Sequence, residues 1–268
     1  MTKPCFCGDR KTKLLYLSGI YRIEQCLTCG QVRIVSSGST HRVGYYQDED
    51  VAYYVEKQDM FRRIFREKLA FIRRFKQRGT LLDIGAGVGL FVDEARSMGY
   101  DAVGVEPSGA SVRAARKHLG VSLQPGEFHK KYFKTLFDIV LMNHVLEHME
   151  DPKRVLYEAR EVLGNQGILV IGVPNFGSFL ARLKRDRWQS LIPDEHRWQF
   201  TLQTLDQLVV PFGFGRVGVS WENHDRSMLA WWKQVAYRLI DMVALFTGKA
   251  EAMLVVYQKS KEHMEQNP

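Results

Sequence analysis

The sequence has only four cysteines, and none of them lies beyond residue 29. A cysteine nucleophile is therefore excluded from the larger, C-terminal part of the chain. Residues 1–10 are polar where a secretory signal would need an apolar core, so we expect a cytoplasmic protein. The longest apolar stretch, residues 228–246, is interrupted by Lys233, Arg238 and Asp241, which excludes a membrane-spanning helix there.

The composition is that of an ordinary globular protein. The chain has 268 residues, of which 45 % are hydrophobic and 25 % charged, so we expect one large domain with a small appendage. The net charge of +8 favours anionic partners such as nucleotide-linked substrates, RNA or a membrane surface. The basic residues are scattered over many short runs, however, as on solvated helix faces.

The cysteines form two close pairs: Cys5 with Cys7, and Cys26 with Cys29. Two such pairs supply four thiolates to one tetrahedral metal ion, which allows a segment without a large core to fold. Short strands are expected at residues 13–17, 21–25 and 32–35. We therefore predict a ribbon over residues 1–40 that holds structural Zn²⁺. The C-x-C spacing of the first pair leaves free thiols or a disulfide as alternatives.

Residues 80–108 predict a strand, a glycine turn, a helix and a second strand that ends in Glu106. Glycines at such a turn let the backbone approach a ligand beneath the N-terminus of the helix. An acid at the tip of the second strand can accept hydrogen bonds from the hydroxyls of a ribose. The pattern after Asp83 is D-x-G-x-G-x-G, which differs from the G-x-G-x-x-G of nicotinamide and flavin folds. The stretch therefore predicts a nucleoside-binding unit.

Residues 83–89, DIGAGVG, resemble the first motif of the class I S-adenosyl-L-methionine-dependent methyltransferases. The resemblance implies an α/β fold with a Rossmann-like, doubly wound sheet of seven strands. In that family the glycine loop packs on the methionine part of the cofactor, the first acid orients its amino end, and the second acid binds its ribose. The cofactor-binding residues implied here are Asp83, Gly85, Ala86, Gly87, Gly89, Glu106, Glu127, Asn143 and Tyr46.

Two of these residues have a plainer alternative interpretation. The resemblance gives Glu127, in the loop after a short strand expected at residues 121–123, the role of accepting the adenine amino group. A solvated loop acid is equally consistent with its position. Tyr46 lies in a linker and could cover the cofactor, but a packed aromatic residue is the favoured interpretation for any single tyrosine of that region.

Residues 136–152, LFDIVLMNHVLEHMEDP, resemble the fourth-strand motif of small-molecule methyltransferases. An apolar strand over residues 137–142 ends in the polar pair Asn143 and His144, and ligands of open α/β folds bind at this edge of the sheet. The resemblance places both residues beside the cofactor and the transferred methyl group, and His144 becomes a candidate catalytic residue. His148 is either part of the site or a packing histidine.

Residues 176–200 form an insertion after the fifth strand, where a substrate would be held. The E-H-x-x-x-F pattern from Glu195 resembles that of nucleotide-sugar C-methyltransferases, which also carry a four-cysteine zinc segment. A histidine or glutamate there can act as general base in that group, and histidine titrates near neutral pH. We predict His196 as base or substrate contact, oriented by Glu195. A structural pair ahead of the next helix is the alternative, and Pro193 stands where that group has a tyrosine.

The remaining segments complete the predicted organisation. Residues 41–78 read as a linker and one amphipathic helix over 51–77, and residues 79–260 as the methyltransferase domain. A second insertion, residues 226–248, has an apolar face that could dock on the protein itself, on a second subunit of a homodimer or on a membrane surface. That face comprises Trp231, Trp232, Val235, Leu239, Met242 and Phe246.

The sequence thus predicts a methyltransferase for a small-molecule acceptor, such as a sugar or a nucleotide-linked metabolite. The motif N-P-P-[YFW], which marks enzymes that methylate exocyclic amino groups, is missing, so oxygens, amines and activated carbons remain as acceptors. One alternative is an RNA methyltransferase whose ribbon and positive charge bind phosphates, although the scattered charge disfavours nucleic acid. Another is a catalytically silent module that binds the cofactor or a partner.

Overall fold

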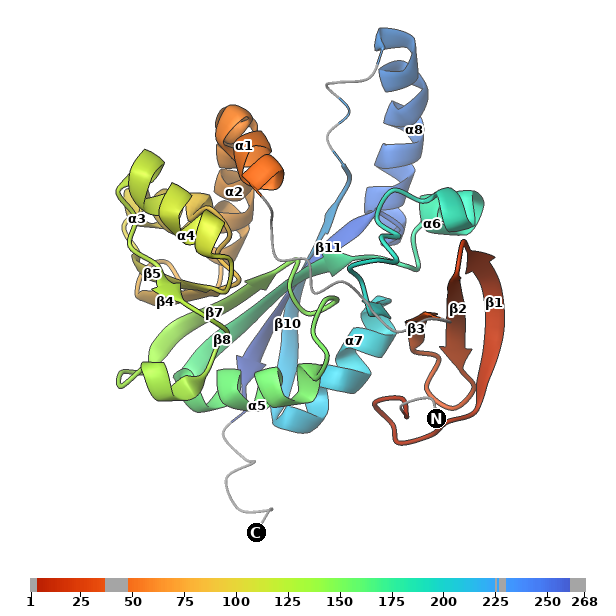
Figure 1. Cartoon of the computed structure of the whole chain (residues 1–268), viewed down its shortest axis with the longest axis horizontal. Coiled ribbons are helices and arrows are strands. Elements are labelled where there is room, and N and C mark those ends of the chain that lie inside the picture. Colours follow the sequence, from red (N-terminus) through yellow and green to blue (C-terminus); the bar gives the residue numbers. More distant parts are fainter. Residues whose placement is uncertain (1–3, 37–47, 225, 227–229, 261–268) are drawn as a thin grey trace.

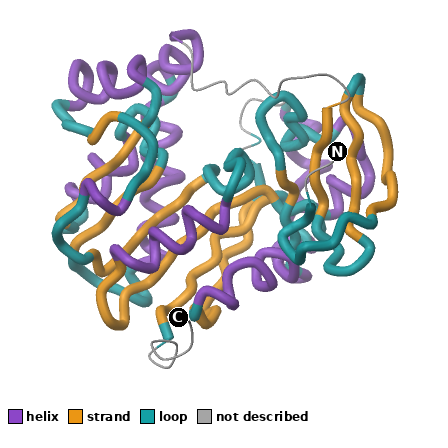
Figure 2. The backbone as a smooth tube through the Cα atoms, turned by 60° about the horizontal axis from the view of Figure 1, so that its bottom comes forward, coloured by secondary structure: helices purple, strands orange, loops and turns teal. Residues whose placement is uncertain are grey.

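The computed structural model describes residues 4–36, 48–224, 226 and 230–260 (Figure 1). Its strands form a seven-stranded and a four-stranded sheet. Figure 2 shows the small sheet, which contains the N-terminal strands, beside the large one. The predicted α/β class and the seven strands of the main sheet are confirmed.

The large sheet has the order β10-β11-β8-β7-β4-β5-β6. The strands from β4 to β8 pair in parallel, whereas β11 is antiparallel to both β8 and β10. The strands are β4 (Thr80–Ile84), β5 (Asp101–Glu106), β6 (Gln124–Pro125), β7 (Phe137–Asn143), β8 (Leu163–Pro174), β10 (Phe214–Glu222) and β11 (Ala252–Lys259). The strand predicted at 121–123 is wrong. Val121 and Leu123 are apolar because they are buried in the core, and strand pairing begins only at Gln124.

Helices cover both faces of the large sheet (Figure 1). The helices α5 (Pro152–Val162) and α7 (Leu202–Val209) pack on one face, and α2 (Gln58–Ile72) and α3 (Leu90–Ser97) pack on the other. The short α4 (Gly109–Ala114) continues in a π-helical turn, Ala115–Leu119. Burial on both faces explains why the central strands read as continuous apolar runs.

The single lead-in helix predicted over residues 51–77 is wrong. The structure has two helices there, α1 (Asp48–Glu56) and α2, and α2 ends at Ile72. The backbone leaves the helical region at Lys57, with φ −97° and ψ 20°. The two helices have different partners, since α1 lies against α4 and α2 against α3. One straight helix could not make both contacts.

An ion-pair network fixes α2 to α3. Glu94, whose side chain is 2 % exposed, pairs with Arg62 at 3.0 Å and with Arg66 at 2.6 Å, and Arg62 also reaches Asp93 at 2.6 Å. Burial raises the pKa of the Glu94 carboxyl, but the guanidinium groups of Arg66 and Arg62 hold it below its ordinary value.

We expect Glu94→Gln to lower the free energy of unfolding by about 1 to 3 kcal/mol at pH 7, because it removes the buried negative charge that both Arg62 and Arg66 contact. Since the folded-state pKa is depressed, this contribution is present above the ordinary glutamate pKa of about 4.3 and fades as pH falls through the folded value. Urea unfolding at pH 7 and below pH 4 measures the loss of unfolding free energy and its dependence on pH. The more exposed Asp93→Asn is the control, with a loss below about 1 kcal/mol, and equal losses in the two variants contradict the prediction.

The small sheet contains the three predicted strands and one unpredicted strand. Its members are β1 (Thr12–Ser18), β2 (Tyr21–Cys26), β3 (Val32–Ser36) and β9 (Trp198–Gln199). The strand β9 belongs to the insertion after β8 and pairs with β3 through Arg33 and Trp198. Ile23 and Ile34 pack on Trp188 and on α6 (Phe179–Lys184) of the same insertion. The insertion therefore completes the N-terminal sheet and joins it to the main domain.

The helix α8 (Trp231–Thr247) stands out from the body of the protein (Figure 1). The six predicted apolar side chains on it are between 50 % and 88 % exposed, so the described part of the protein does not cover this face. Docking of this face on a second subunit or on a membrane surface stays a prediction. Among the described residues, no helix combines the length and the apolar character needed to cross a membrane.

Candidate active site

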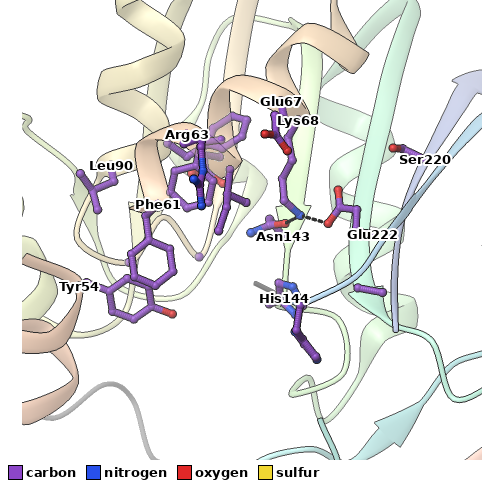
Figure 3. A pocket seen from close by; sticks show the side chains of 18 of the residues that line it. Tyr54, Phe61, Arg63, Glu67, Lys68, Leu90, Asn143, His144, Ser220 and Glu222 are labelled. Carbon is purple, nitrogen blue, oxygen red and sulfur yellow. Dashed lines mark hydrogen bonds and ion pairs between the residues drawn. The ribbon is translucent and has the colours of Figure 1, made fainter. Parts of the chain in front are cut away.

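A pocket of about 580 Å³ opens at the carboxyl ends of β4 and β7, between α2 and β10 (Figure 3). It brings together six of the predicted site residues: Asp83, Gly85, Ala86, Gly87, Asn143 and His144. Gly89 lies at the N-cap of α3 with φ +79°, where a Cβ would meet Ala115 at 3.1 Å. Tyr46 lies outside the described residues.

The glycine turn is tied to the acid at the end of β5. Glu106 is 3 % exposed, and its carboxylate accepts hydrogen bonds from the backbone N–H groups of Gly87 at 2.8 Å and Ser108 at 2.7 Å. Burial raises the pKa of Glu106, and these hydrogen bonds oppose part of that rise. The pKa of Asp83 is raised well above its ordinary value, mainly by burial and to a smaller extent by the nearby charge of Glu106. Two buried acids at this turn favour a ligand with a cationic group.

Asn143 and Lys68 form the opposite wall. Lys68 is 5 % exposed, and its ammonium donates to Oδ1 of Asn143 at 3.0 Å and pairs with Glu222 at 2.7 Å (Figure 3). Gly172 of β8 makes room for Asn143, because a Cβ there would lie 2.6 Å from its Oδ1. Lys68 and Glu222 were not predicted from the sequence, because no local pattern separates this lysine from the other basic residues of α2.

His144 begins the turn after β7. Its backbone has φ +56°, and its N–H donates to the carbonyl of Gly172 at 2.8 Å. Nδ1 of the ring lies 3.2 Å from Oε1 of Glu147, which is 1 % exposed. Burial raises the pKa of Glu147, but the hydrogen bond and charge of His144, with the imidazoles of His148 and His196, bring it down to about 2. An ionised Glu147 can hold the proton of His144 on Nδ1 and leave Nε2 as the basic atom.

His196 lies beside the pocket, outside the residues that line it. It is 4 % exposed, and its ring meets that of His148 edge to face at 4.7 Å. Burial lowers the pKa of His196 to about 4, against the opposing charge of Glu147. The carboxylate beside His196 is thus that of Glu147, whereas Glu195 is exposed. The catalytic roles predicted for His196 and Glu195 stay predictions.

Two further sets of predicted residues are placed by the structure. Glu127 is exposed and lies 3.7 Å from Arg154, and its contact with adenine stays a prediction.

The four cysteine sulfurs all lie within 4.8 Å of one another, with Sγ–Sγ distances of 3.4 Å for Cys5 and Cys29 and 3.6 Å for Cys7 and Cys26. This closed set of thiolates fits one tetrahedral zinc ion, which would have a structural role.

Comparisons with known proteins agree with this geometry. A family model described as a methyltransferase domain matches residues 56–217. The chain is 30 % identical over 127 residues to an uncharacterised protein of Methanocaldococcus jannaschii, covering 47 % of this chain and 60 % of that protein. It is also 30 % identical over 135 residues to the mitochondrial ubiquinone biosynthesis O-methyltransferase of Schizosaccharomyces pombe, covering 47 % and 46 %. The chain thus spans about half the length of these curated relatives.

A solved structure shares the fold. The crystal structure of an S-adenosylmethionine-dependent methyltransferase from Thermotoga maritima matches with a TM-score of 0.58 at 22 % identity. The match covers 80 % of this chain and 97 % of that one. At this identity the likeness supports the fold alone.

Proposed function

Because the chain belongs to the methyltransferase domain family, we propose that it transfers the methyl group of S-adenosylmethionine to a hydroxyl oxygen of a small-molecule acceptor. The observation that carries the choice of a hydroxyl is the pair formed by His144 and Glu147, since His144 lines the same pocket as the glycine turn. Oxygen acceptors need a base, and this pair supplies one.

The cofactor half of the pocket is the side of Asp83 and the glycine turn. The cofactor, when bound, supplies an electrophilic methyl group on a positively charged sulfur. Glu106, at the end of β5, would accept the ribose hydroxyls, and Gly87 lines the pocket. The buried acid Asp83 favours the cationic amino end.

The acceptor half is the side of β7 and β10. His144 would take the hydroxyl proton at Nε2 as the oxygen forms its bond to the methyl carbon, and Glu147 would stabilise the resulting imidazolium. Holding the oxygen in line with the methyl group supplies much of the remaining rate enhancement. Tyr54, Phe61 and Trp221 add aromatic surface to the lining of a pocket whose volume suits a small molecule. The S. pombe relative is itself named an O-methyltransferase.

Calorimetric titration with S-adenosylmethionine, with NADH as a parallel control, tests the cofactor. Transfer of a labelled methyl group to a cell extract, fractionated into small molecules and RNA, then tests the acceptor. We expect micromolar binding of the sulfonium cofactor alone and label in a small-molecule ether. Label in RNA, or in an amine, contradicts the proposed acceptor, and binding without any labelled product favours a silent binding module.

The role of His144 is tested by replacing it. We expect His144→Gln to keep cofactor affinity and to lower the turnover number by about 10²- to 10⁴-fold, the usual contribution of a general base. The exposed His118→Asn is the matched control and should behave as wild type. Unchanged turnover in His144→Gln assigns this histidine to structure.

The role of Glu106 is tested through cofactor affinity. We expect Glu106→Ala to weaken binding by about 1 to 3 kcal/mol, because it removes hydrogen bonds to a charged acceptor. Calorimetry measures the change in affinity. Circular dichroism checks that the loss of the hydrogen bond between Glu106 and the glycine turn has not unfolded the domain. Glu161→Ala, an exposed acid of α5, is the control. Wild-type affinity in Glu106→Ala means that the ribose lies elsewhere.

A further inference from the structure

We propose that Glu147, His148 and His196 form a binding site for a divalent first-row transition-metal ion beside the pocket. Each of the three side chains offers one ligand atom, and these atoms all lie within 4.8 Å of one another. Two of the residues belong to the turn after β7, and the third comes from the insertion after β8. The site is separate from the four cysteines.

One carboxylate oxygen of Glu147 has no hydrogen-bond partner among the described residues. Oε1 contacts the ring of His144 at 3.2 Å, but Oε2 is buried and has no hydrogen-bond partner among the described residues. Glu147 itself is 1 % exposed. A buried carboxylate oxygen without a partner is costly, and a bound cation is a partner that satisfies it.

Neighbouring groups hold the two imidazole rings in place. The backbone of Ser190 hydrogen-bonds the His196 ring, and the amide Nε2 of Gln199 lies 3.3 Å from its Nδ1. His148 approaches at an interplanar angle of 81°, so the rings converge without stacking.

Backbone hydrogen bonds lock the two segments together. The N–H groups of Arg197 and Trp198 donate to the carbonyl of Glu147, at 2.8 Å and 3.1 Å. The indole Nε1 of Trp198 also donates to the carbonyl of Met149 at 2.9 Å. The ligands therefore sit on a fixed frame, so binding a metal ion costs little ordering of the chain.

The ligand set selects the kind of metal. Two imidazoles and one carboxylate suit zinc, iron, cobalt or nickel better than magnesium, which prefers oxygen ligands. Three protein ligands leave a coordination position open to water, unlike the closed set of four thiolates in the ribbon. The contact between Glu147 and His144 links the site to the wall of the pocket.

Cobalt binding tests this proposal on the full chain, without cofactor or acceptor, so the result does not depend on the proposed methyl transfer. The ribbon is first loaded with zinc, and Co²⁺ is then added under equilibrium dialysis. We expect one further metal equivalent, with visible d–d bands and without the thiolate-to-cobalt charge-transfer band that a ribbon site would give. Wild-type protein that takes up no second equivalent, or only thiolate-bound cobalt, overturns the proposal.

Variants assign the ligands. We expect His196→Asn and the more exposed His148→Asn to lose the second equivalent, and His118→Asn, away from the cluster, to keep it. Circular dichroism monitors folding, and His148→Asn serves if His196→Asn does not fold. Wild-type cobalt binding in folded His148→Asn rules out this ligand set.

Discussion

Replacement of Gly87 by arginine is expected to abolish binding of S-adenosylmethionine while the protein stays folded. Gly87 has φ +53°, and a Cβ built on it would have no heavy atom within 4 Å. The folded state therefore accommodates a side chain at a cost of about 1 to 2 kcal/mol for the left-handed backbone. The arginine would extend into the pocket and bring a positive charge to the place expected for a sulfonium. Calorimetry measures the affinity, and thermal unfolding measures the stability.

Gly120→Arg is the matched control for this change. Gly120 has φ +66° and equally open space around a Cβ, but it ends the π-helical turn away from the pocket. We expect both variants to lose similar stability and only Gly87→Arg to lose the cofactor. Cofactor binding by Gly87→Arg at wild-type strength would place the ligand away from the glycine turn.

The second large effect concerns the four cysteines. We expect Cys26→Ser to abolish the zinc binding predicted for the four cysteines and to unfold β1, β2 and β3. Metal binding in small zinc domains supplies about 10 to 16 kcal/mol of apparent folding free energy at pH 7. The ribbon's own core is small, so we do not expect its packing, including the contact of Ile23 with Trp188, to replace the metal. Zinc content by mass spectrometry and amide hydrogen exchange over the three strands measure the effect.

Leu27→Ser controls for the substitution itself. Leu27 lies between the two cysteines of the second pair and is 60 % exposed, so its loss should leave zinc and amide protection unchanged. Retained protection in Cys26→Ser, with or without zinc, would mean that the strands are held by packing. A chelator should reproduce the effect of Cys26→Ser in the wild-type protein.

The part of the site that could be predicted consists of residues whose positions follow from the adjacent strand, turn or helix. The turn at Gly87 and the acid at Glu106 belong to one continuous unit of strand, turn and helix, so their spacing alone predicted that they meet. Asn143 and His144 were predicted for the same reason, because they directly follow an apolar strand. Each of these predictions needs only the neighbouring residues and the rule that parallel strands end at one edge.

The parts that the sequence did not predict depend on distant contacts. Adjacency suggested Glu195 as the partner of His196, but the carboxylate nearest to it is that of Glu147, brought there by the turn after β7. Lys68 enters the pocket only because α2 crosses the edge of the sheet. The break at Lys57 likewise reflects two packing partners, which the periodicity of one helix cannot show.

The pairing of β3 with β9 sets an order of events during synthesis. Arg33 and Trp198 pair across the sheet, yet Trp198 leaves the ribosome long after Arg33. At about 5 to 20 residues per second the delay is roughly 8 to 33 seconds. During that time β3 is an open edge and Ile34 lacks its cover, a state prone to pairing with other chains. Early capture of zinc by the cysteines would shorten the exposure of the nascent ribbon, so metal supply should govern how much of the protein is recovered unaggregated.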